Sequence, residues 1–234
     1  MQEETSDNVS VELLSFNNLS LEGYPLVLDN YQRAYVWGVD KVIQLLNDLL
    51  SFIQESEDED AYYMGTLLLH KKIGEKQKVL CVIDGQQRLT SLAVLYWLLN
   101  KQLPTHIQFS FRSSRSMVNV QQAKQTIQHW LAENNLEIDK LVGVFDRLRF
   151  TVIIVTREDL AFTFFDTQNN RGVPLGSTDL LKSFHLRAIH SDDAQIDELL
   201  QSHCASRWEK VQVQGELGKL SSNHDFAPEL FHYY

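Results

Sequence analysis

A polar cluster separates two apolar runs near the middle of the chain. The cluster consists of Asp84, Gly85, Gln86, Gln87 and Arg88. The apolar runs at 79–83 and 89–99 predict a strand that turns directly into a helix. The N–H groups and the dipole at the start of such a helix attract phosphate, arginine adds a bidentate fork, and glutamines add neutral donors and acceptors. The pattern therefore indicates a phosphate or nucleotide site.

Helix capping explains part of this cluster. Asp84 is suited to the N-cap of the helix, and Gln87, three residues later, can complete a capping box. Gly85 would then occupy the first helical position, where the absence of a side chain lets another molecule approach the backbone. Gln86 and Arg88 remain unexplained by capping, and they carry the argument for an anion site.

Two further polar clusters flank this one in the sequence. NYQRAYVW at 30–37 places Gln32 and Arg33 among aromatic residues, which taken alone is explained by an aromatic lid over the core. The aromatic residues are Tyr31, Tyr35 and Trp37. NNRGVPLGSTDLLK at 169–182 surrounds a glycine loop with polar groups, and taken alone it is explained by the end of one helix and the start of another. Its polar groups include Asn169, Arg171 and Lys182.

The composition is that of a globular protein. Its 234 residues are 44% apolar and 22% charged, which is enough for a substantial core. The N-terminus is acidic and polar, and no apolar run reaches the roughly 18 to 20 residues of a membrane span. We therefore expect a soluble, cytoplasmic protein without a membrane partner. Cys81 and Cys204 form no C-x-x-C pair, which argues against a disulfide framework or a cysteine-rich zinc site.

The net charge of -10 hides a strong polarity along the chain. Residues 1–60 carry 13 acidic and 2 basic residues, residues 61–157 carry 6 acidic and 13 basic, and residues 158–234 carry 12 acidic and 6 basic. The middle block, at +7, is the part suited to an anionic partner. Neutralisation between the blocks within the fold is the alternative explanation.

Hydrophobic periodicity predicts an α+β domain with a helical extension. The predicted strands span 11–16, 24–28, 63–72, 77–83, 106–111 and 148–156. The predicted helices span 40–55, 88–101, 117–134, 159–168, 179–189 and 193–212. Asp40 is expected to cap the first helix, and the strands 63–72 and 77–83 are expected to form a hairpin.

Taken together, the clusters resemble the N-terminal domain of the GmrSD-type, modification-dependent restriction proteins. The segments YQRAYVW, YMGTLLL, VIDGQQRLTSL and FFDTQNNRGVPLGSTDLLK follow the family pattern, over about residues 20–190. The matching residues are Tyr31, Gln32, Arg33, Tyr35, Trp37, Asp84, Gly85, Gln86, Gln87, Arg88, Asn169, Arg171, Gly172, Asp179 and Lys182. Gln168 stands where the family usually has an apolar residue, and Ser91 where a second threonine is common.

The resemblance implies a ParB/sulfiredoxin-like fold, with a mixed sheet core and the DGQQR junction lining a nucleotide pocket. Sulfiredoxins need a cysteine inside this motif, and Gln86 holds that position, so sulfinic acid reduction is not expected. The resemblance also implies bacterial defence against phage, in which nucleoside triphosphate hydrolysis is coupled to DNA cleavage by a C-terminal HNH nuclease.

On this basis residues 1–190 are predicted to form the nucleotide-binding domain and residues 191–234 a helical extension. The apolar ending LFHYY suggests a cut before a nuclease domain, and the nearest histidine pair, His185 and His190, lacks the spacing of a metal-binding helix. We therefore do not expect nuclease activity from this chain alone.

The leading hypothesis is an NTP-hydrolysing domain of a GmrSD-like anti-phage restriction system that acts on modified DNA. The ligand would be a nucleoside triphosphate with Mg²⁺, and Asp84 would hold the metal. The expected catalytic residues are Asp84, Gln86, Gln87 and Arg88. The expected nucleotide-binding residues are Tyr31, Gln32, Arg33, Trp37, Gly85, Thr90, Asn169, Arg171 and Lys182.

Other functions remain open at this point. The expected partners are the NTP, modified phage DNA and an HNH nuclease domain in the full-length protein or in a second protein, and the oligomeric state is open. The main alternative is a non-catalytic, modification-sensing DNA-binding domain that uses the basic middle block. A degenerate scaffold and a phosphotransferase acting on a small hydroxyl compound are further alternatives.

Overall fold

A computed structural model describes most of the chain. The described residues are 9–29, 32–57, 59–74, 78–111, 113–134, 138–157, 159–161, 163–164, 182, 185–186, 188–189 and 194–219. Side chains are not described at 138–139, 194–195, 198, 209 and 211–219. The chain divides into two compact units, Met1–Leu175 and Gly176–Tyr234. The functional boundary predicted near residue 190 stays a prediction.

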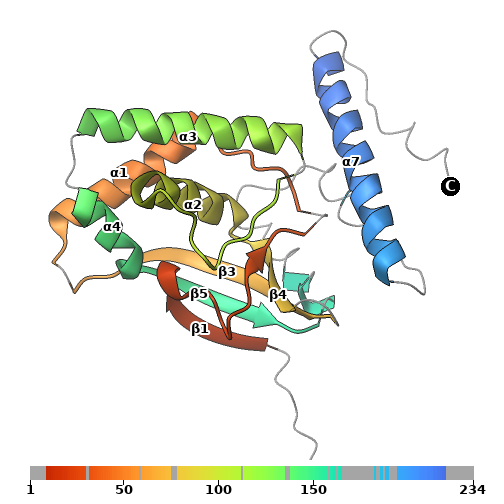
Figure 1. Ribbon diagram of the computed structural model, residues 1–234, viewed down its shortest axis with the longest axis horizontal. Helices are drawn as coiled ribbons and strands as arrows, with labels where there is room; N and C mark the ends of the chain where they lie inside the picture. Colours follow the sequence, from red (N-terminus) through yellow and green to blue (C-terminus); the bar gives the residue numbers. More distant parts are fainter. Residues whose placement is uncertain are drawn as a thin grey trace, which may run out of the picture. The chain divides into compact units, whose positions relative to one another are not determined.

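Within the described residues, the first unit is built on a five-stranded sheet with the order β1-β5-β3-β4-β2 (Figure 1). The strands are β1 (Val9–Ser15), β2 (Leu26–Val27), β3 (Tyr62–Ile73), β4 (Lys78–Asp84) and β5 (Leu148–Val155). Antiparallel pairing joins β1 to β5 and β3 to β4, whereas β3–β5 and β2–β4 are parallel. The mixed sheet confirms the predicted α+β class and the predicted hairpin.

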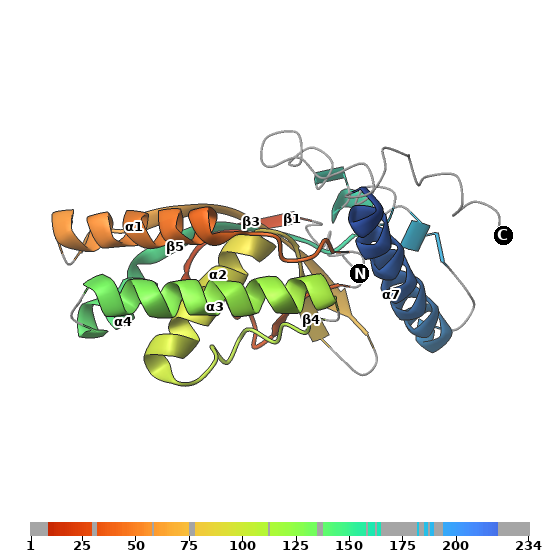
Figure 2. The same ribbon diagram turned by 90° about the horizontal axis from the view of Figure 1, so that it is seen from above.

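Helices α1 to α4 lie on one side of this sheet (Figure 1). They are α1 (Val39–Glu55), α2 (Gln86–Asn100), α3 (Ser114–Asn134) and α4 (Ile138–Arg147). A short 3-10 helix, η1 (Phe16–Asn18), follows β1. The long helices α1 and α3 pack together, and α2 packs against α3 (Figure 2).

The burial of the helices follows from their sequences. In α1 the apolar residues recur at helical spacing, so only one stripe is buried, formed by Val42, Leu45, Leu46 and Leu49. In α2 buried residues occur on every side of the helix, from Gln86 to Leu98. Helix α2 is therefore the central helix of the unit, and any polar group on it needs a partner inside the protein or a ligand.

The two faces of the sheet differ in their cover. On β5, Leu148, Phe150 and Val152 are fully buried and belong to the core beneath the helices. On β1, Val11 and Leu13 are 61% and 65% exposed, and they face the opposite side because they pair with Ile153 and Thr151. The face away from the helices is therefore open at this end of the sheet.

Several predicted elements are confirmed and others are wrong. The helices predicted at 40–55 and 117–134 and the strand predicted at 148–156 match α1, α3 and β5. The strand predicted at 106–111 is absent from the described chain, which has only a single bridge between Ile107 and Leu26. Its partner β2 is two residues long, so no ladder can extend. Helix α4 was not predicted.

The start of α1 also differs from the prediction. Its N-cap is Gly38, with an extended backbone and no side-chain cap, so the assignment of Asp40 as the N-cap is wrong. Asp40 lies instead in the first turn, where its negative charge complements the helix dipole.

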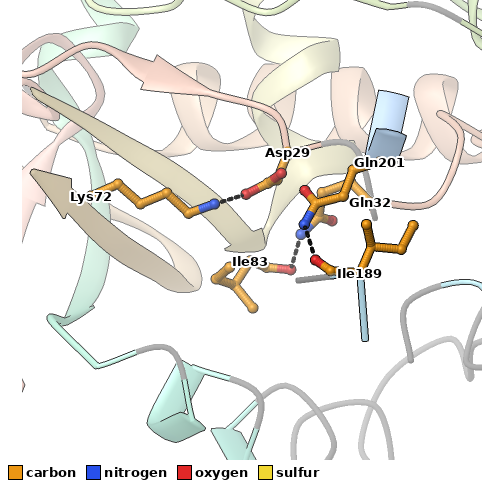
Figure 3. Close-up of polar contacts among 6 residues, drawn as sticks. All are labelled: Asp29, Gln32, Lys72, Ile83, Ile189 and Gln201. Atoms are coloured by element: carbon orange, nitrogen blue, oxygen red, sulfur yellow. Dashed lines mark hydrogen bonds and ion pairs between the residues drawn. The ribbon is translucent and has the colours of Figure 1, made fainter. Parts of the chain in front are cut away.

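The second unit contains the long helix α7 (Ala194–Lys219), which confirms the helix predicted at 193–212. Within this unit, Gln201 Nε2 donates a hydrogen bond of 3.5 Å to the carbonyl of Ile189 (Figure 3). No helix in the described part of the chain is both long and apolar enough to cross a membrane.

Candidate functional site

The polar cluster predicted from the sequence lies where β4 leads into α2. Asp84 is the last residue of β4, and the N-cap of α2 is Gly85, in the left-handed region at φ 97°. At this φ any residue with a side chain would be strained, and a Cβ would also lie 2.2 Å from Leu67 Cδ2, so the position favours glycine. The assignment of Asp84 as the N-cap is therefore wrong.

Gln87 does not form the predicted capping box. Its Oε1 accepts hydrogen bonds from the backbone N–H groups of Val36 (2.8 Å) and Trp37 (3.2 Å), and its Nε2 donates to the carbonyl of Ala34 (3.1 Å). The side chain is buried. Gln87 therefore holds the irregular segment 32–38 against α2, which is a structural role.

The same segment is fixed to α2 and α3 through Tyr35, which is fully buried. Its hydroxyl lies 2.8 Å from Ser91 Oγ, its N–H donates to Ser116 Oγ, and its carbonyl accepts from Asn119 Nδ2. Burial raises the pKa of Tyr35 to about 12. The aromatic cluster thus contributes a packed cover over α2, as the simpler sequence interpretation proposed.

The beginning of the segment is tied to the sheet. Gln32 Nε2 donates a hydrogen bond of 3.3 Å to the carbonyl of Ile83, the residue before Asp84, and Asp29 forms an ion pair with Lys72 (Figure 3). The Gln32 contact places the described part of the YQRAYVW segment beside the end of β4. The structure therefore brings the YQRAYVW and DGQQR clusters together.

Arg88 is bound to the backbone of β3. Its Nη1 donates to the carbonyl of Met64 and its Nη2 to the carbonyl of Thr66, the latter at 2.6 Å. The register of β4 on β3 begins only at Leu68. The guanidinium therefore takes the place of a neighbouring strand for two carbonyls beyond the end of β4.

This contact explains a glycine in the neighbouring strand. Gly65 lies between the two carbonyls, at a β-bulge in the β3–β5 pairing, with φ 96°. A Cβ at Gly65 would lie 2.3 Å from Arg88 Nη1. The Arg88 side chain therefore needs a glycine at position 65, although the two residues are far apart in the sequence.

Part of this junction remains available to a ligand. The described hydrogen bonds of Arg88 use two of the five N–H donors of an arginine. Asp84 Oδ2 lies 3.8 Å from Arg88 Nη2, and the Asp84 side chain is 43% exposed. Burial lowers the pKa of Arg88, while the charges of Asp84 and Tyr63 act in the opposite direction. The arginine stays charged beside an exposed carboxylate.

The first turn of α2 also holds polar groups without partners. Gln86 is 5% exposed and Thr90, one turn later, is 2% exposed. Within the described chain, neither Gln86 Oε1 nor Thr90 Oγ1 has a hydrogen-bond partner. No side chain caps this helix, and its first turn contains no acidic residue. The positive end of α2 is therefore not compensated by the described side chains.

A sequence comparison identifies the family. The profile of the family described as "GmrSD restriction endonuclease, N-terminal domain" matches residues 12–186, about three quarters of the chain. The chain belongs to this family. Membership places it among DNA-acting restriction proteins of phage defence. No curated protein matches the chain.

The other residues predicted for the site of this GmrSD-family domain fall into three groups. Arg33 and Trp37 are half-buried, and Trp37 packs against the core. Lys182 is 2% exposed and belongs to the second unit. Tyr31, Asn169 and Arg171 lie outside the described residues. Among the described residues, no three His, Cys, Asp or Glu side chains are grouped to hold a metal ion.

Tyr63, which is not among the site residues predicted from the sequence, lies beside the bulge. Tyr63 is 57% exposed, and its hydroxyl lies 3.0 Å from Thr151 Oγ1. Hydrogen bonds with Thr151 and Thr66 and the charge of Arg88 lower the pKa of Tyr63. Its place in YMG, two residues before the glycine that Arg88 requires, was the available signal.

A buried histidine lies in the segment after α2. His106 is 6% exposed, its Nε2 has no hydrogen-bond partner among the described residues, and burial lowers its pKa to about 4. Its ring centroid lies 5.4 Å from that of Phe16, which in turn contacts Tyr96 of α2. His106 is therefore an uncharged member of the packing around α2.

Proposed function

We propose that this domain binds a nucleoside triphosphate with Mg²⁺ at the N-terminus of α2 and hydrolyses it, within a GmrSD-like restriction system that acts on modified phage DNA. The supporting observation is the start of α2, where a helix end without a side-chain cap adjoins the buried Gln86, whose Oε1 has no hydrogen-bond partner among the described residues. Such a helix end binds phosphate through its N–H groups and its dipole. An HNH nuclease in the full-length protein or in a partner would cleave the DNA.

The proposal gives each residue of the junction a separate task. The N–H groups after Gly85 and the uncommitted donors of Arg88 would bind phosphate oxygens. Asp84 would hold Mg²⁺, which needs only one or two carboxylates when phosphates supply further ligands. Gln86 would gain a hydrogen-bond partner from the ligand, whereas Gln87 would act only by holding the segment 32–38 in place.

The first test is phosphate release from each NTP with Mg²⁺, together with calorimetric measurement of nucleotide affinity. Asp84→Asn should abolish hydrolysis and leave the melting temperature nearly unchanged, because this side chain is partly exposed. Asp40→Asn in the first turn of α1 is the matched control and should hydrolyse like the wild type. Absence of hydrolysis in the wild type, or full hydrolysis by Asp84→Asn, would reject the proposal.

Arg88→Ala is a poor test of the same site. It would remove the hydrogen bonds to the carbonyls of Met64 and Thr66 as well as any phosphate contact. Gln86→Met is more informative, because removing a buried group without a partner is nearly neutral or stabilising. A variant that folds at least as well as the wild type and binds nucleotide more weakly would separate binding from folding.

Non-catalytic DNA binding is the second candidate function. The observation in its favour is the β3–β4 hairpin, where the ammonium groups of Lys71 and Lys78 lie 4.9 Å and 5.9 Å from the centroid of the Tyr24 ring. Against it, Lys71 is paired with Glu22, so part of the basic block is neutralised by the acidic N-terminal block. DNA affinity that falls steeply with salt, without NTP binding, would favour this candidate.

A further inference from the structure

Tyr63 lies on the open face of the sheet, immediately before the β3 bulge. Its ring is 57% exposed, while its hydroxyl is anchored to Thr151 Oγ1 of β5. Its neighbour Tyr62 is more buried and packs on Phe52, with the ring centroids 5.2 Å apart. Tyr62 therefore serves the packing of the fold, whereas Tyr63 presents a fixed ring to solvent.

An exposed apolar residue of the edge strand β1 lies near Tyr63. Thr151, which holds the Tyr63 hydroxyl, pairs in register with Leu13 of the edge strand β1. Paired residues of neighbouring strands point to the same face. Leu13 is 65% exposed, so it adds apolar surface near Tyr63 on the side of the sheet away from the helices, where the register partner of Tyr63 is Arg149.

The bulge of β3 connects the surroundings of Tyr63 with the candidate phosphate site. Arg88 binds the carbonyls of Met64 and Thr66, which flank the bulge directly after Tyr63. Asp84 pairs in register with Leu68, whose β5 partner is Ile153. Alternation along β5 places Ile153 on the same face as Thr151. The Tyr63 hydroxyl lies at the β5 edge of β3, whereas the guanidinium and the exposed carboxylate lie at its β4 edge, so a ligand in contact with all three groups would cross β3 at the bulge.

We propose that Tyr63 is the base-binding residue of the nucleotide site. The nucleobase would stack on the Tyr63 ring, with the edge of the base near Leu13, while the phosphates extend toward Arg88 and the start of α2. This inference rests on the proposed function, and it assigns the base to Tyr63 in place of Tyr31 or Trp37. Because every base has a π-face, stacking gives little discrimination among the four NTPs.

The test compares a nucleotide with a ligand that has no base. Calorimetry would measure the affinities of ATP and of inorganic tripolyphosphate, each with Mg²⁺, for the wild type, Tyr63→Ala and Tyr63→Phe. Tyr63→Ala should weaken ATP binding roughly tenfold, because it removes one base–aromatic stack. It should leave tripolyphosphate affinity unchanged. Tyr63→Phe keeps the ring and should retain most of the ATP affinity.

Ile73→Ala is the matched control, since Ile73 is 64% exposed at the other end of the same strand. It should bind both ligands like the wild type. Unchanged ATP affinity in Tyr63→Ala, or an equal loss of ATP and tripolyphosphate, would overturn the inference and leave the proposed function standing. A Tyr63→Ala variant that loses DNA binding but keeps the ATP affinity of the wild type would also overturn it. If the wild type binds neither ligand, the proposed function fails, and the inference fails with it.

Discussion

Helices α1 and α2 have similar N-caps but differ in the charge of their first turns. Each has a glycine N-cap, Gly38 or Gly85, and within the described chain neither has a side-chain cap. Helix α1 carries Asp40 in its first turn, whereas the first turn of α2 has no acidic residue and contains the buried amide of Gln86. Helix α1 thus supplies its own counter-charge, whereas the first turn of α2 supplies none.

The two glycines differ as well. Gly38 has φ -87°, and a Cβ at this position would meet no described atom within 4 Å, so its identity is not enforced by contacts. Gly85 has φ 97°, and its Cβ would lie 2.2 Å from Leu67. The start of α1 tolerates change, while the start of α2 is held in one arrangement. This difference is expected where a helix end serves a ligand and not only the fold.

The largest effect should come from the bulge that positions Arg88. Gly65→Ala combines a positive φ with a methyl group 2.3 Å from Arg88 Nη1, and it should lower the free energy of unfolding by about 4 kcal/mol. Urea denaturation would measure this loss. In an Arg88→Ala background the additional cost of Gly65→Ala should be smaller, because the overlap is gone.

Gly38→Ala is the control for this prediction and should cost less than about 1 kcal/mol. Equal losses at Gly38 and Gly65 would mean that the bulge bound by Arg88 is no more constrained than the start of α1.

Adjacent glutamines of α2 should respond in opposite ways. Gln87→Leu removes three hydrogen bonds to the segment 34–37 and should lower the free energy of unfolding by about 3 kcal/mol. Gln86→Met should leave stability unchanged or raise it slightly, and should weaken nucleotide binding. Thermal unfolding and calorimetry on the same samples would measure both quantities. A stability loss in Gln86→Met as large as that in Gln87→Leu would show that Gln86 belongs to the scaffold.

Acid should weaken the packing around α2 through His106. Its pKa is about 4 in the folded protein and near 6.5 in the unfolded chain, so below pH 6.5 the unfolded state binds a proton that the folded state does not. Its contribution is present in full above pH 6.5 and is lost as the pH falls toward 4. The loss at pH 5 should be about 2 kcal/mol relative to pH 7.5.

Denaturant titrations between pH 5 and 7.5 would measure the His106 effect. His106→Leu should flatten this part of the pH profile, whereas replacement of the 78% exposed His129 should not. An unchanged slope in His106→Leu would assign the acid sensitivity to other groups.

The smallest effect concerns the counter-charge of α1. Asp40→Asn should cost about 0.5 kcal/mol at low ionic strength, because it removes a negative charge from the first turn. The cost should shrink in 1 M salt, where exposed charges are screened. A salt-independent cost would mean that Asp40 acts through a local hydrogen bond and that the electrostatic contrast between the two helices is weaker than proposed.

Sequence periodicity predicted the elements that bury one stripe or alternate regularly. The apolar stripe of α1 and the alternation along β5 report burial directly, so both elements were found. The segment 106–111 has strand-like composition and forms only one bridge, because the length of its partner β2 is not visible in its own sequence. Helix existence was predicted better than helix capping, since both Asp40 and Asp84 were wrongly assigned as N-caps.

The junction motif was located from the sequence, but its internal division of labour was not. Gln87 and Arg88 bind backbone atoms of segments that lie 22 to 53 residues away, and such partners leave no periodic signal. The pairing of Gly65 with Arg88 was likewise hidden, although both lie in segments that follow the family pattern. Residue chemistry indicated that polar groups gather here, and only the fold shows which of them are already occupied.

Arg88 also affects the exposed edge of β3 beyond the end of β4. Hydrogen-bonding edges of strands recruit other strands, and many proteins protect them with charge or with covering segments. Beyond the end of β4, a single side chain occupies the carbonyls of β3 that an incoming strand would need. Lysine could not bridge both carbonyls with one ammonium group in the same planar geometry. Arg88 therefore opposes the pairing of this part of β3 with another strand, in addition to shaping the junction.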